Sequence, residues 1–373
     1  MSRVQLLPHV CEEKLVSVPA ELRGGISQGI RLMGAPVMWA ADWDGRGVAV
    51  GVIDTGIDDG HPDLRGQVVG RRDYVNDGEP AALWHPHGTH VAGIIAADGE
   101  LQGVAPGCKL RDYRVLDKNG YGEWPAICQA VRDAVTDGCQ IINMSLGGPE
   151  DDPGLHDAIR AAVAAGVTVV VAVGNDGAQR ISYPGYYPEV IGAGAVMIRP
   201  DGLVMRSWFS NTNPEVDVCA PGQDVISCAA GGGYLAMSGT SMASPHVAGK
   251  AALEEQRGRA RLGRPMSEPG RWEAIKVNTI DVMMPGVDTS TGAGFVSALP
   301  VFPVRRRIEL QKGNREMLVD GGAVMLDVPA QIINGRFVAP FRAMAENVGG
   351  TVGFDEKTMV GSADFWLLPG MEV

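Results

Sequence analysis

The sequence predicts an α/β protein with a mainly parallel sheet, followed by a separate small module of α+β type. Two observations predict this. Between about residues 46 and 260, nearly continuous apolar runs rich in Val and Ile alternate with amphipathic segments, as in sheets whose strands are buried on both faces. After about residue 304 the pattern changes to short strands and one helix, which indicates a second unit.

The elements of the first unit can be placed in chain order. Strands are expected over residues 47–55, 109–116, 139–146, 167–174, 189–196 and 216–222. Helices are expected over residues 87–98, 123–138, 155–166 and 240–256. Gly138 and Gly166 should end two of these helices, because glycine readily adopts the left-handed conformation of a helix C-cap. In such a fold ligands bind outside the carboxyl ends of the strands.

Composition excludes several classes of function. The chain has 373 residues and a formal net charge of −12, which argues against nucleic-acid binding because that requires a basic face. No apolar stretch approaches the roughly 18 residues of a membrane helix. The first apolar run is shorter and more polar than a secretory signal. A cytoplasmic protein without nucleic-acid or membrane partners is therefore expected.

Three short stretches fall where such a fold carries chemistry. The first, VGVIDTGIDDGHPDL, places Asp54 at the carboxyl end of a buried strand. An Asp-Thr-Gly triplet is also typical of pepsin-type aspartic peptidases, which need two such loops facing each other. The segment VDTSTG near residue 288 comes close to a second copy but does not match it. The aspartic-peptidase interpretation is therefore the weaker one.

The other two stretches are HPHGTHVAG, with His85, His87 and His90, and SGTSMASPHVAG, with Ser241 at a helix start. Taken singly, the histidines could be metal ligands or structural groups, and the serine could be an N-cap. No carboxylate or cysteine completes a ligand set beside the histidines. The order Asp, His, Ser at the ends of successive α/β elements is instead one of the known orders of a catalytic triad.

These stretches resemble the signature motifs of the subtilisin family (subtilases) of serine peptidases. The resemblance implies a three-layer subtilisin-like fold and an endopeptidase that needs no cofactor for its chemistry. It implies that Asp54 orients His87, that His87 is the general base and acid, and that Ser241 is the nucleophile. In VAVGNDG, Asn175 matches the side chain that stabilises the oxyanion together with the Ser241 N–H. The other two histidines are then structural.

The resemblance also implies where a polypeptide substrate binds. Ser145, Leu146 and Gly147 match the strand on which family substrates pair, and YGEW matches the opposing strand. Gly122 stands where many relatives carry an aromatic residue, so an open pocket is expected for the fourth residue before the cut. Ser182 matches the floor of the pocket for the residue just before the cut. Broad, apolar-leaning specificity is expected.

Within the family the likeness is nearest to the intracellular subtilisins, through LLPHV, RLMGAPVMWA, IINMSLGGP and FSNTNPEVDVCAPG. In those relatives the segment at LLPHV lies across the active-site cleft as an inhibitory pro-segment. Leu6 and Leu7 are therefore expected in apolar subsites, while Pro8 prevents a productive strand because it fixes φ and lacks an N–H. His9 replaces an aromatic residue, which predicts a weaker, pH-sensitive clamp.

The expected domains are an inhibitory extension at 1–22, a peptidase domain at 23–300 and a module at 304–373. The extension should be lost by cleavage between Leu15 and Gly25. The module resembles the copper amine oxidase N-terminal-like module, without a His/Cys cluster for copper, and is common on exported proteins, so the cell surface is the alternative location. Asp63 matches a structural calcium ligand of the family, although the loop at 98–102 is shorter than in most relatives.

Two further alternatives concern the protein as a whole. Some intracellular subtilisins dimerise through their tails, so a homodimer is a candidate assembly for this chain. The competing function is a catalytically silent binding or scaffold protein with a subtilase fold. The joint presence of Asp54, His87, Ser241 and Asn175 argues against that alternative.

Overall fold

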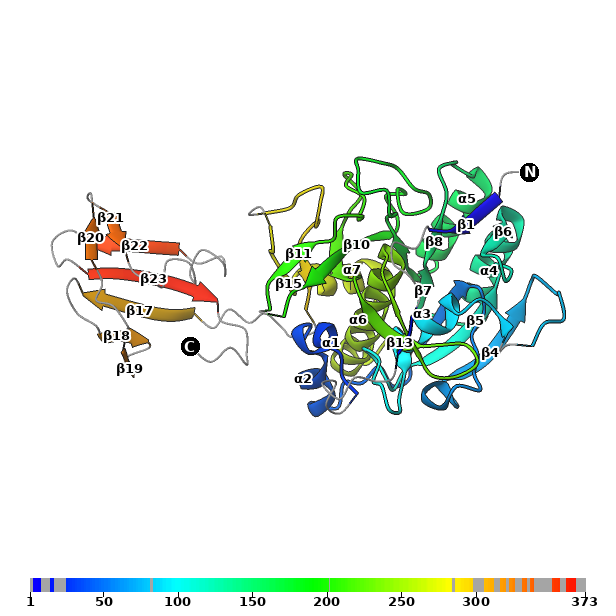
Figure 1. Cartoon of the computed structure of the whole chain (residues 1–373), viewed down its shortest axis with the longest axis horizontal. Helices are drawn as coiled ribbons and strands as arrows, with labels where there is room; N and C mark the ends of the chain where they lie inside the picture. The colour runs from blue at the N-terminus through cyan, green and yellow to red at the C-terminus, as the bar shows by residue number, and fades with distance from the viewer. Residues whose placement is uncertain are drawn as a thin grey trace. The chain divides into compact units, whose positions relative to one another are not determined.

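The computed structural model describes residues 3–7, 14–16, 25–80, 83–200, 202–283 and 286–297, together with the strands of the carboxyl-terminal part. The chain divides into two compact units, Met1–Pro300 and Val301–Val373 (Figure 1). Among the described helices, none is long and apolar enough to cross a bilayer. Pro8 and His9 lie outside the described residues.

The first unit is built on a ten-stranded sheet. Its strand order is β15 (Thr279–Ile280), β16 (Phe295–Val296), β12 (Val218–Pro221), β10 (Ile191–Ile198), β9 (Thr168–Ala172), β7 (Ile141–Met144), β3 (Ala49–Asp54), β5 (Lys109–Arg114) and β4 (Val68–Asp73), with β11 (Val204–Arg206) paired to β10. Neighbours from β16 to β4 run parallel. The strands expected from the sequence form the centre of this sheet, so the predicted α/β class is confirmed.

Helices cover both faces of the sheet (Figure 1). They are α1 (Gln28–Leu32), α2 (Ala35–Ala40), α3 (His87–Ala96), α4 (Trp124–Thr136), α5 (Pro153–Ala164), α6 (Thr240–Leu262) and α7 (Glu268–Lys276). Successive strand residues point to opposite faces. Val170 accordingly joins the apolar core shared with α3 and α6, whereas Val169 and Val171 join the core shared with α4 and α5. This produces three layers.

Glycines end two of the expected helices as predicted. Gly138, after α4, has φ +79°, and Gly166, after α5, has φ +87°. Both angles lie in the left-handed region that favours glycine, so the chain can turn from each helix into the next strand. Helix α6 runs further than the sequence pattern suggested and ends at Gly263, which has φ +66°.

Two small sheets involve the amino-terminal segment. Strand β1 (Arg3–Leu6) lies between β6 (Tyr121–Glu123) and β8 (Leu146–Gly147), antiparallel to both. Strand β2 (Lys14–Val16) pairs with β14 (Tyr234–Met237), which pairs in turn with β13 (Val225–Cys228). The first residues of the chain thus add a strand to each of two separate places on the first unit.

The second unit contains antiparallel strands. The larger sheet has the order β19 (Gly322–Met325), β18 (Glu316–Val319), β17 (Arg305–Gln311), β23 (Val360–Trp366), β22 (Thr351–Asp355), and β20 (Gln331–Ile333) pairs with β21 (Arg336–Val338). These strands agree with the β-rich pattern of the sequence. Of the segment 338–349, where the sequence predicts a helix, Val338 ends β21 and residues 339–349 lie outside the described residues.

Candidate active site

The carboxyl end of β3 and the start of α3 bring two candidate catalytic residues together. Asp54 is the last residue of β3, His87 is the first residue of α3, and both side chains are buried. Nδ1 of His87 lies 2.8 Å from one oxygen of the Asp54 carboxylate and 3.0 Å from the other. The carboxylate therefore favours the tautomer that carries its proton on Nδ1. The lone pair of the neutral ring is then on Nε2, where it can accept a proton.

Thr55 holds the backbone on both sides of His87. Its hydroxyl donates to the carbonyl oxygen of His85 and accepts from the N–H of Gly88, both at 2.9 Å. The Thr55 N–H also donates to the Asp54 carboxylate at 2.7 Å. One residue thus orients the carboxylate and fixes the turn that presents the imidazole.

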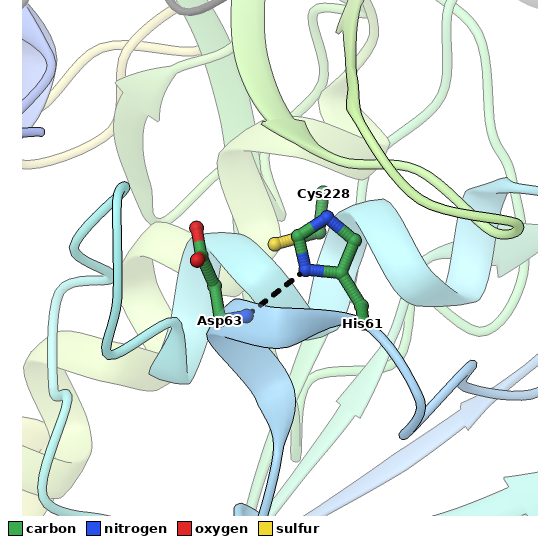
Figure 2. A group of neighbouring side chains, drawn as sticks. All are labelled: His61, Asp63 and Cys228. Carbon is green, nitrogen blue, oxygen red and sulfur yellow. Dashed lines mark hydrogen bonds between the residues drawn. The ribbon is translucent and has the colours of Figure 1, made fainter.

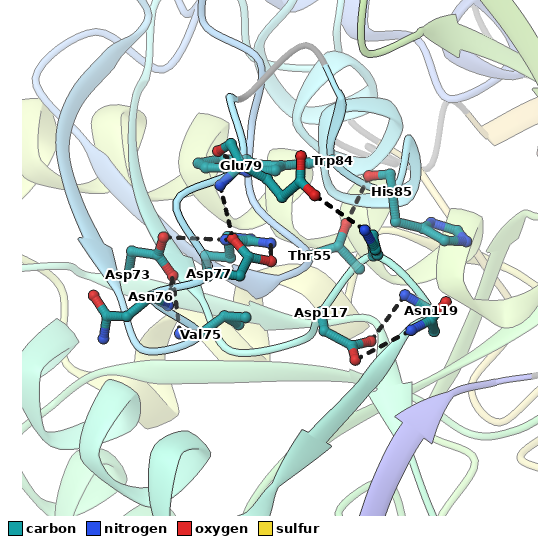
Figure 3. A network of polar contacts seen from close by, with 12 residues as sticks. Thr55, Asp73, Val75, Asn76, Asp77, Glu79, Trp84, His85, Asp117 and Asn119 are labelled. Carbon is teal, nitrogen blue, oxygen red and sulfur yellow. Dashed lines mark hydrogen bonds and ion pairs between the residues drawn. The ribbon is translucent and has the colours of Figure 1, made fainter.

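The segment that leads into α3 is anchored by a polar network (Figure 3). The buried Arg114 guanidinium pairs with Asp73 at 3.1 Å and with Asp77 at 2.7 Å. It also lies over the Trp84 ring, 4.4 Å from the centroid, while the Trp84 indole donates to the Glu79 carbonyl at 2.8 Å. The hydrogen bond from Arg114 lowers the pKa of Asp77 to about 2, so this pair stays charged at neutral pH. This network connects Asp73, Asp77 and Trp84 through the shared Arg114 side chain.

The two remaining histidines of the motif bond to backbone groups. Nδ1 of His85 accepts from the N–H of His87 at 3.3 Å. Burial, followed by the electrostatic effect of the neighbouring His87, lowers the pKa of His85 to about 4, so the His85 ring is neutral at physiological pH. Nε2 of His90 lies 3.0 Å from the carbonyl oxygen of Val225 and 3.1 Å from that of Leu235. His90 therefore ties α3 to the β13–β14 hairpin.

Ser241 lies in the first turn of α6, beside the end of β7. Its hydroxyl donates to the carbonyl oxygen of Ser145 at 3.2 Å. The Ser145 hydroxyl donates in turn to the Ser241 carbonyl at 2.9 Å. The positive end of the helix dipole at this turn favours negative charge that develops near the Ser241 oxygen.

Asn175 follows β9 and is oriented by the residue before Ser241. Its side-chain oxygen accepts from the N–H and the hydroxyl of Thr240, both at 2.8 Å. Because both Thr240 groups donate, the amide atom that they contact is the oxygen of Asn175. The Nδ2 donor is therefore on the other side of the amide. A Cβ at Gly239 would lie 3.1 Å from that Nδ2, which makes glycine favourable on the donor side.

The sequence reasoning missed the two threonines that organise this site. Thr55 directly follows Asp54 and Thr240 directly precedes Ser241. The sequence feature that could have indicated them is a hydroxyl side chain directly next to a candidate catalytic residue. The bonds themselves join segments that lie far apart in the chain, so the sequence alone could not identify the partners.

The predicted substrate-binding residues border β1. In the strand register Val4 faces Gly122 on β6, and Leu6 faces Leu146 on β8. The N–H of Leu6 donates to the carbonyl oxygen of Gly120 at 2.9 Å. A strand bound antiparallel between two protein strands is the geometry in which a peptide adds to a sheet edge.

The side chains from Val4 to Leu7 differ in burial. Val4 and Leu7 are buried, Gln5 is exposed and Leu6 is half-buried. A Cβ at Gly147 would lie 2.5 Å from Ser182 Oγ and 3.1 Å from a methyl carbon of Leu7. Leu7 thus lies close to Gly147, which was expected on the substrate-pairing strand, and Gly147 lies close to Ser182, which was expected at the floor of a pocket.

The surroundings of Gly122 differ from a simple open pocket. A Cβ at this position would lie 2.5 Å from the carbonyl oxygen of Val115 and 2.7 Å from a methyl carbon of Leu116. Any larger residue would therefore require the backbone to shift. Val4, the residue opposite, is fully buried in the apolar cluster that also contains Trp124. Val4 thus lies opposite Gly122 in the strand register, with its side chain in this apolar cluster.

The residues around Asp63 do not fit a calcium ion. Its Oδ1 accepts from the N–H of Glu100 at 2.9 Å, and its Oδ2 accepts from the N–H of Leu101 at 2.8 Å and from the hydroxyl of Tyr234 at 2.9 Å. Calcium needs six or more oxygens whose lone pairs face the ion. A Cβ at Gly99 would lie only 2.2 Å from Oδ1, so the loop rests directly on the carboxylate.

His61 and Cys228 lie close to Asp63 (Figure 2), but the three residues do not form a transition-metal site. Ligand atoms of His61, Asp63 and Cys228 lie within 4.8 Å of one another. However, His61 Nδ1 accepts from the Asp63 N–H at 3.2 Å, and Nε2 lies 2.8 Å from the carbonyl of Gly233, so Nε2 carries a proton. Burial raises the pKa of the Cys228 thiol, which disfavours the thiolate that binds metals.

The site thus holds a buried Asp–His pair, a serine at a helix start and an oriented amide, which are the groups that a serine hydrolase uses. Residues 45–294 match the Subtilase family (peptidase S8), and the chain belongs to this family. Residues 303–361 match the copper amine oxidase N-terminal domain. Both resemblances seen in the sequence are thereby confirmed.

Several curated relatives match about two thirds or more of the chain. An intracellular serine protease of Paenibacillus polymyxa is 43% identical over 68% of this chain and 80% of its own length. The major intracellular serine protease of Bacillus subtilis is 39% identical over 79% of this chain and 92% of its own length. Subtilisin E of the same organism is 40% identical over 66% of this chain and 63% of its own length. These relatives confirm the assignment of the chain to the serine peptidases.

Proposed function

We propose that the chain is a serine endopeptidase made as a precursor, in which Asp54, His87 and Ser241 form the catalytic triad. The observation that carries the proposal is the pair of contacts of 2.8 and 3.0 Å between His87 Nδ1 and the Asp54 carboxylate, at the end of the strand that family peptidases use. Asn175, oriented by Thr240, is the second oxyanion donor.

The proposed reaction follows from these positions. Ser241 Oγ attacks the carbonyl carbon of the peptide bond, and its proton passes to His87 Nε2. The oxygen of the tetrahedral intermediate carries the negative charge and accepts from Asn175 Nδ2 and the Ser241 N–H. His87 then protonates the leaving amine, which leaves an ester on Ser241. Water hydrolyses this ester, with His87 again as base, and restores the free hydroxyl. Asp54 stabilises the imidazolium in both halves of the reaction.

The amino-terminal extension is proposed to inhibit the enzyme. Strand β1 occupies the position between β6 and β8 that an extended substrate would take. A segment tethered to the same chain has a high effective concentration, so modest contacts suffice to block the cleft. Pro8 would follow Leu7 at the scissile position, where its fixed φ and missing N–H oppose cleavage.

The proposed substrates are polypeptides with apolar side chains near the cut. Leu7 is buried beside Gly147 and Ser182, and Val4 is buried opposite Gly122, so these two positions are expected to accept aliphatic residues. Gln5 is exposed, and little selectivity is expected at its position.

The location of the protein, its assembly and the role of the second unit are also proposed. The names of two relatives, both intracellular proteases, support a cytoplasmic location. A homodimer and a binding role for the second unit are proposed from the sequence alone. The catalytically silent alternative has no observation in its favour.

Labelling with a fluorophosphonate probe tests the proposed nucleophile, because only an activated serine reacts. After the chain has processed itself, the probe should label Ser241, as mapped by mass spectrometry of peptides. Ser241→Ala should remove the label and reduce casein hydrolysis by several orders of magnitude, a size known from subtilisin itself. Undiminished hydrolysis by this folded variant would rule out the assignment.

A further inference from the structure

The second strand of the extension has its own partner. Strand β2 runs antiparallel to β14, with Val16 opposite Tyr234, Leu15 opposite Leu235 and Lys14 opposite Ala236. The three-stranded sheet has the order β13-β14-β2, so without β2 the strand β14 would be an edge. An edge strand presents unpaired N–H and C=O groups that can accept another strand.

We propose that the outer edge of β14 is a docking site for the extension, which is thereby held at two places. The inference rests on the proposed inhibition, because it states how the inhibitory segment is kept in the cleft. Its occupant is the segment Lys14–Val16 of the same chain, recognised through backbone hydrogen bonds.

Strand β14 is also held by side-chain contacts that do not involve β2. The Tyr234 hydroxyl donates to Asp63 at 2.9 Å, and the Leu235 carbonyl oxygen lies 3.1 Å from His90 Nε2. Tyr234, Leu235 and Met237 are all buried. A preorganised edge loses little conformational freedom when a strand binds, so a short strand can be held there.

The register shows which backbone groups of β14 face β2. At the hairpin turn the Ala229 N–H donates to the Gly233 carbonyl at 3.0 Å, so this pair is hydrogen-bonded. Hydrogen-bonded pairs alternate along an antiparallel ladder. The N–H and C=O groups of Leu235 therefore face β13. The N–H and C=O groups of Tyr234 and Ala236 face β2.

The same alternation identifies the bonding residues of β2. Val16, opposite Tyr234, and Lys14, opposite Ala236, exchange hydrogen bonds with β14. The N–H of Leu15 faces away from β14. A proline is therefore disruptive at Val16 and tolerated at Leu15, where it removes no ladder bond.

The second attachment shortens the tether of β1. With β2 docked, β1 is connected to a fixed strand through residues 7–13; with β2 released, the connection runs from residue 7 to 24. A shorter connection raises the effective concentration of β1 at the cleft. A cut after Val16 would also release both strands as one peptide, which can rebind through either strand.

The test compares initial rates on one chromogenic peptide for intact full-length chains, with intact amino termini verified by mass spectrometry. Val16→Pro should raise the rate about fivefold or more, the factor that corresponds to about 1 kcal/mol. Leu15→Pro, the matched control, should behave as the parent chain. Gln5→Pro removes an N–H of β1 that faces β8, and should also raise the rate.

The outcomes separate the two hypotheses. If Gln5→Pro leaves the rate unchanged, the proposed inhibition by β1 is wrong. If Gln5→Pro raises the rate but Val16→Pro matches Leu15→Pro, inhibition stands and the docking site on β14 is wrong. Both variants raising the rate supports the two-place attachment.

Hydrogen exchange provides a structural measurement that does not depend on activity. In full-length chains carrying Ser241→Ala, which prevents self-cleavage, the amides of Tyr234 and Ala236 should exchange slowly. Adding Val16→Pro should speed their exchange at least about fivefold, and adding Leu15→Pro should not. Equal exchange at both amides in all three chains would overturn the inference.

Discussion

Two threonines, each next in sequence to a candidate catalytic residue, connect parts of the site that lie far apart in the chain. Thr55 connects the turn after Asp54 to the backbone on either side of His87. Thr240 connects the turn before Ser241 to the amide of Asn175. Because catalytic groups must be positioned within fractions of an ångström, these bonds fix the geometry before a substrate binds.

The Asn175 amide gives a prediction at this scale. Asn175→Ala removes one donor to the oxyanion and should lower kcat by about 10² to 10³, a magnitude established on subtilisin. KM should change little, because the donor interacts most strongly with the charge that forms in the transition state. Steady-state kinetics on a peptide substrate would measure this split.

A matched control is Asn211→Ala. Asn211 lies beside Asn175 in the fold, where its side chain accepts from the Asp176 N–H and donates to the Val173 carbonyl. This change should reduce stability more than kcat. A loss of kcat as large as that of Asn175→Ala would argue against a special role for the Asn175 amide.

At the scale of elements, hydrogen bonds connect three segments around Asp63. The 3-10 helix Pro62–Leu64 carries the carboxylate, the loop at 97–103 supplies two N–H donors, and β14 supplies the Tyr234 hydroxyl. Such donors stabilise the buried carboxylate through hydrogen bonds, so it needs no bound cation as a partner. The stability of this region should therefore not depend on calcium.

Tyr234→Phe tests this account together with a chelator. In the Ser241→Ala background, where self-digestion cannot occur, EDTA should leave the apparent unfolding midpoint unchanged within error. Tyr234→Phe removes a hydrogen bond to a charged group and should lower the midpoint by about 3 to 6 °C with or without EDTA.

The opposite pattern would contradict the account. If calcium at millimolar concentration raises the midpoint and Asp63→Asn abolishes that rise, a cation binds at Asp63 after all. Differential scanning calorimetry at one fixed scan rate would distinguish these results.

At the scale of the whole molecule, local patterns predicted most of the first unit and the order of its candidate catalytic residues. The buried strands, the helices and the helix-ending Gly138 and Gly166 each depend on sequence-local chemistry. The environment of Asp63 could not be predicted from local sequence, because one of its hydrogen-bond donors is Tyr234, which lies 171 positions further along the chain. Strand β2 was missed for a similar reason: three residues carry no periodic signal, and only pairing with β14 defines them.

The central claim is that the full-length chain is an inhibited precursor of a serine peptidase. The most direct test compares the rates of three proteins on one peptide substrate. They are the intact full-length chain, a chain that begins near Gly25, and full-length Pro8→Ala. The account predicts that the shortened chain is faster and that Pro8→Ala is cut more readily within its own extension. Equal rates for the full-length and shortened chains, while the full-length amino terminus remains intact, would contradict it.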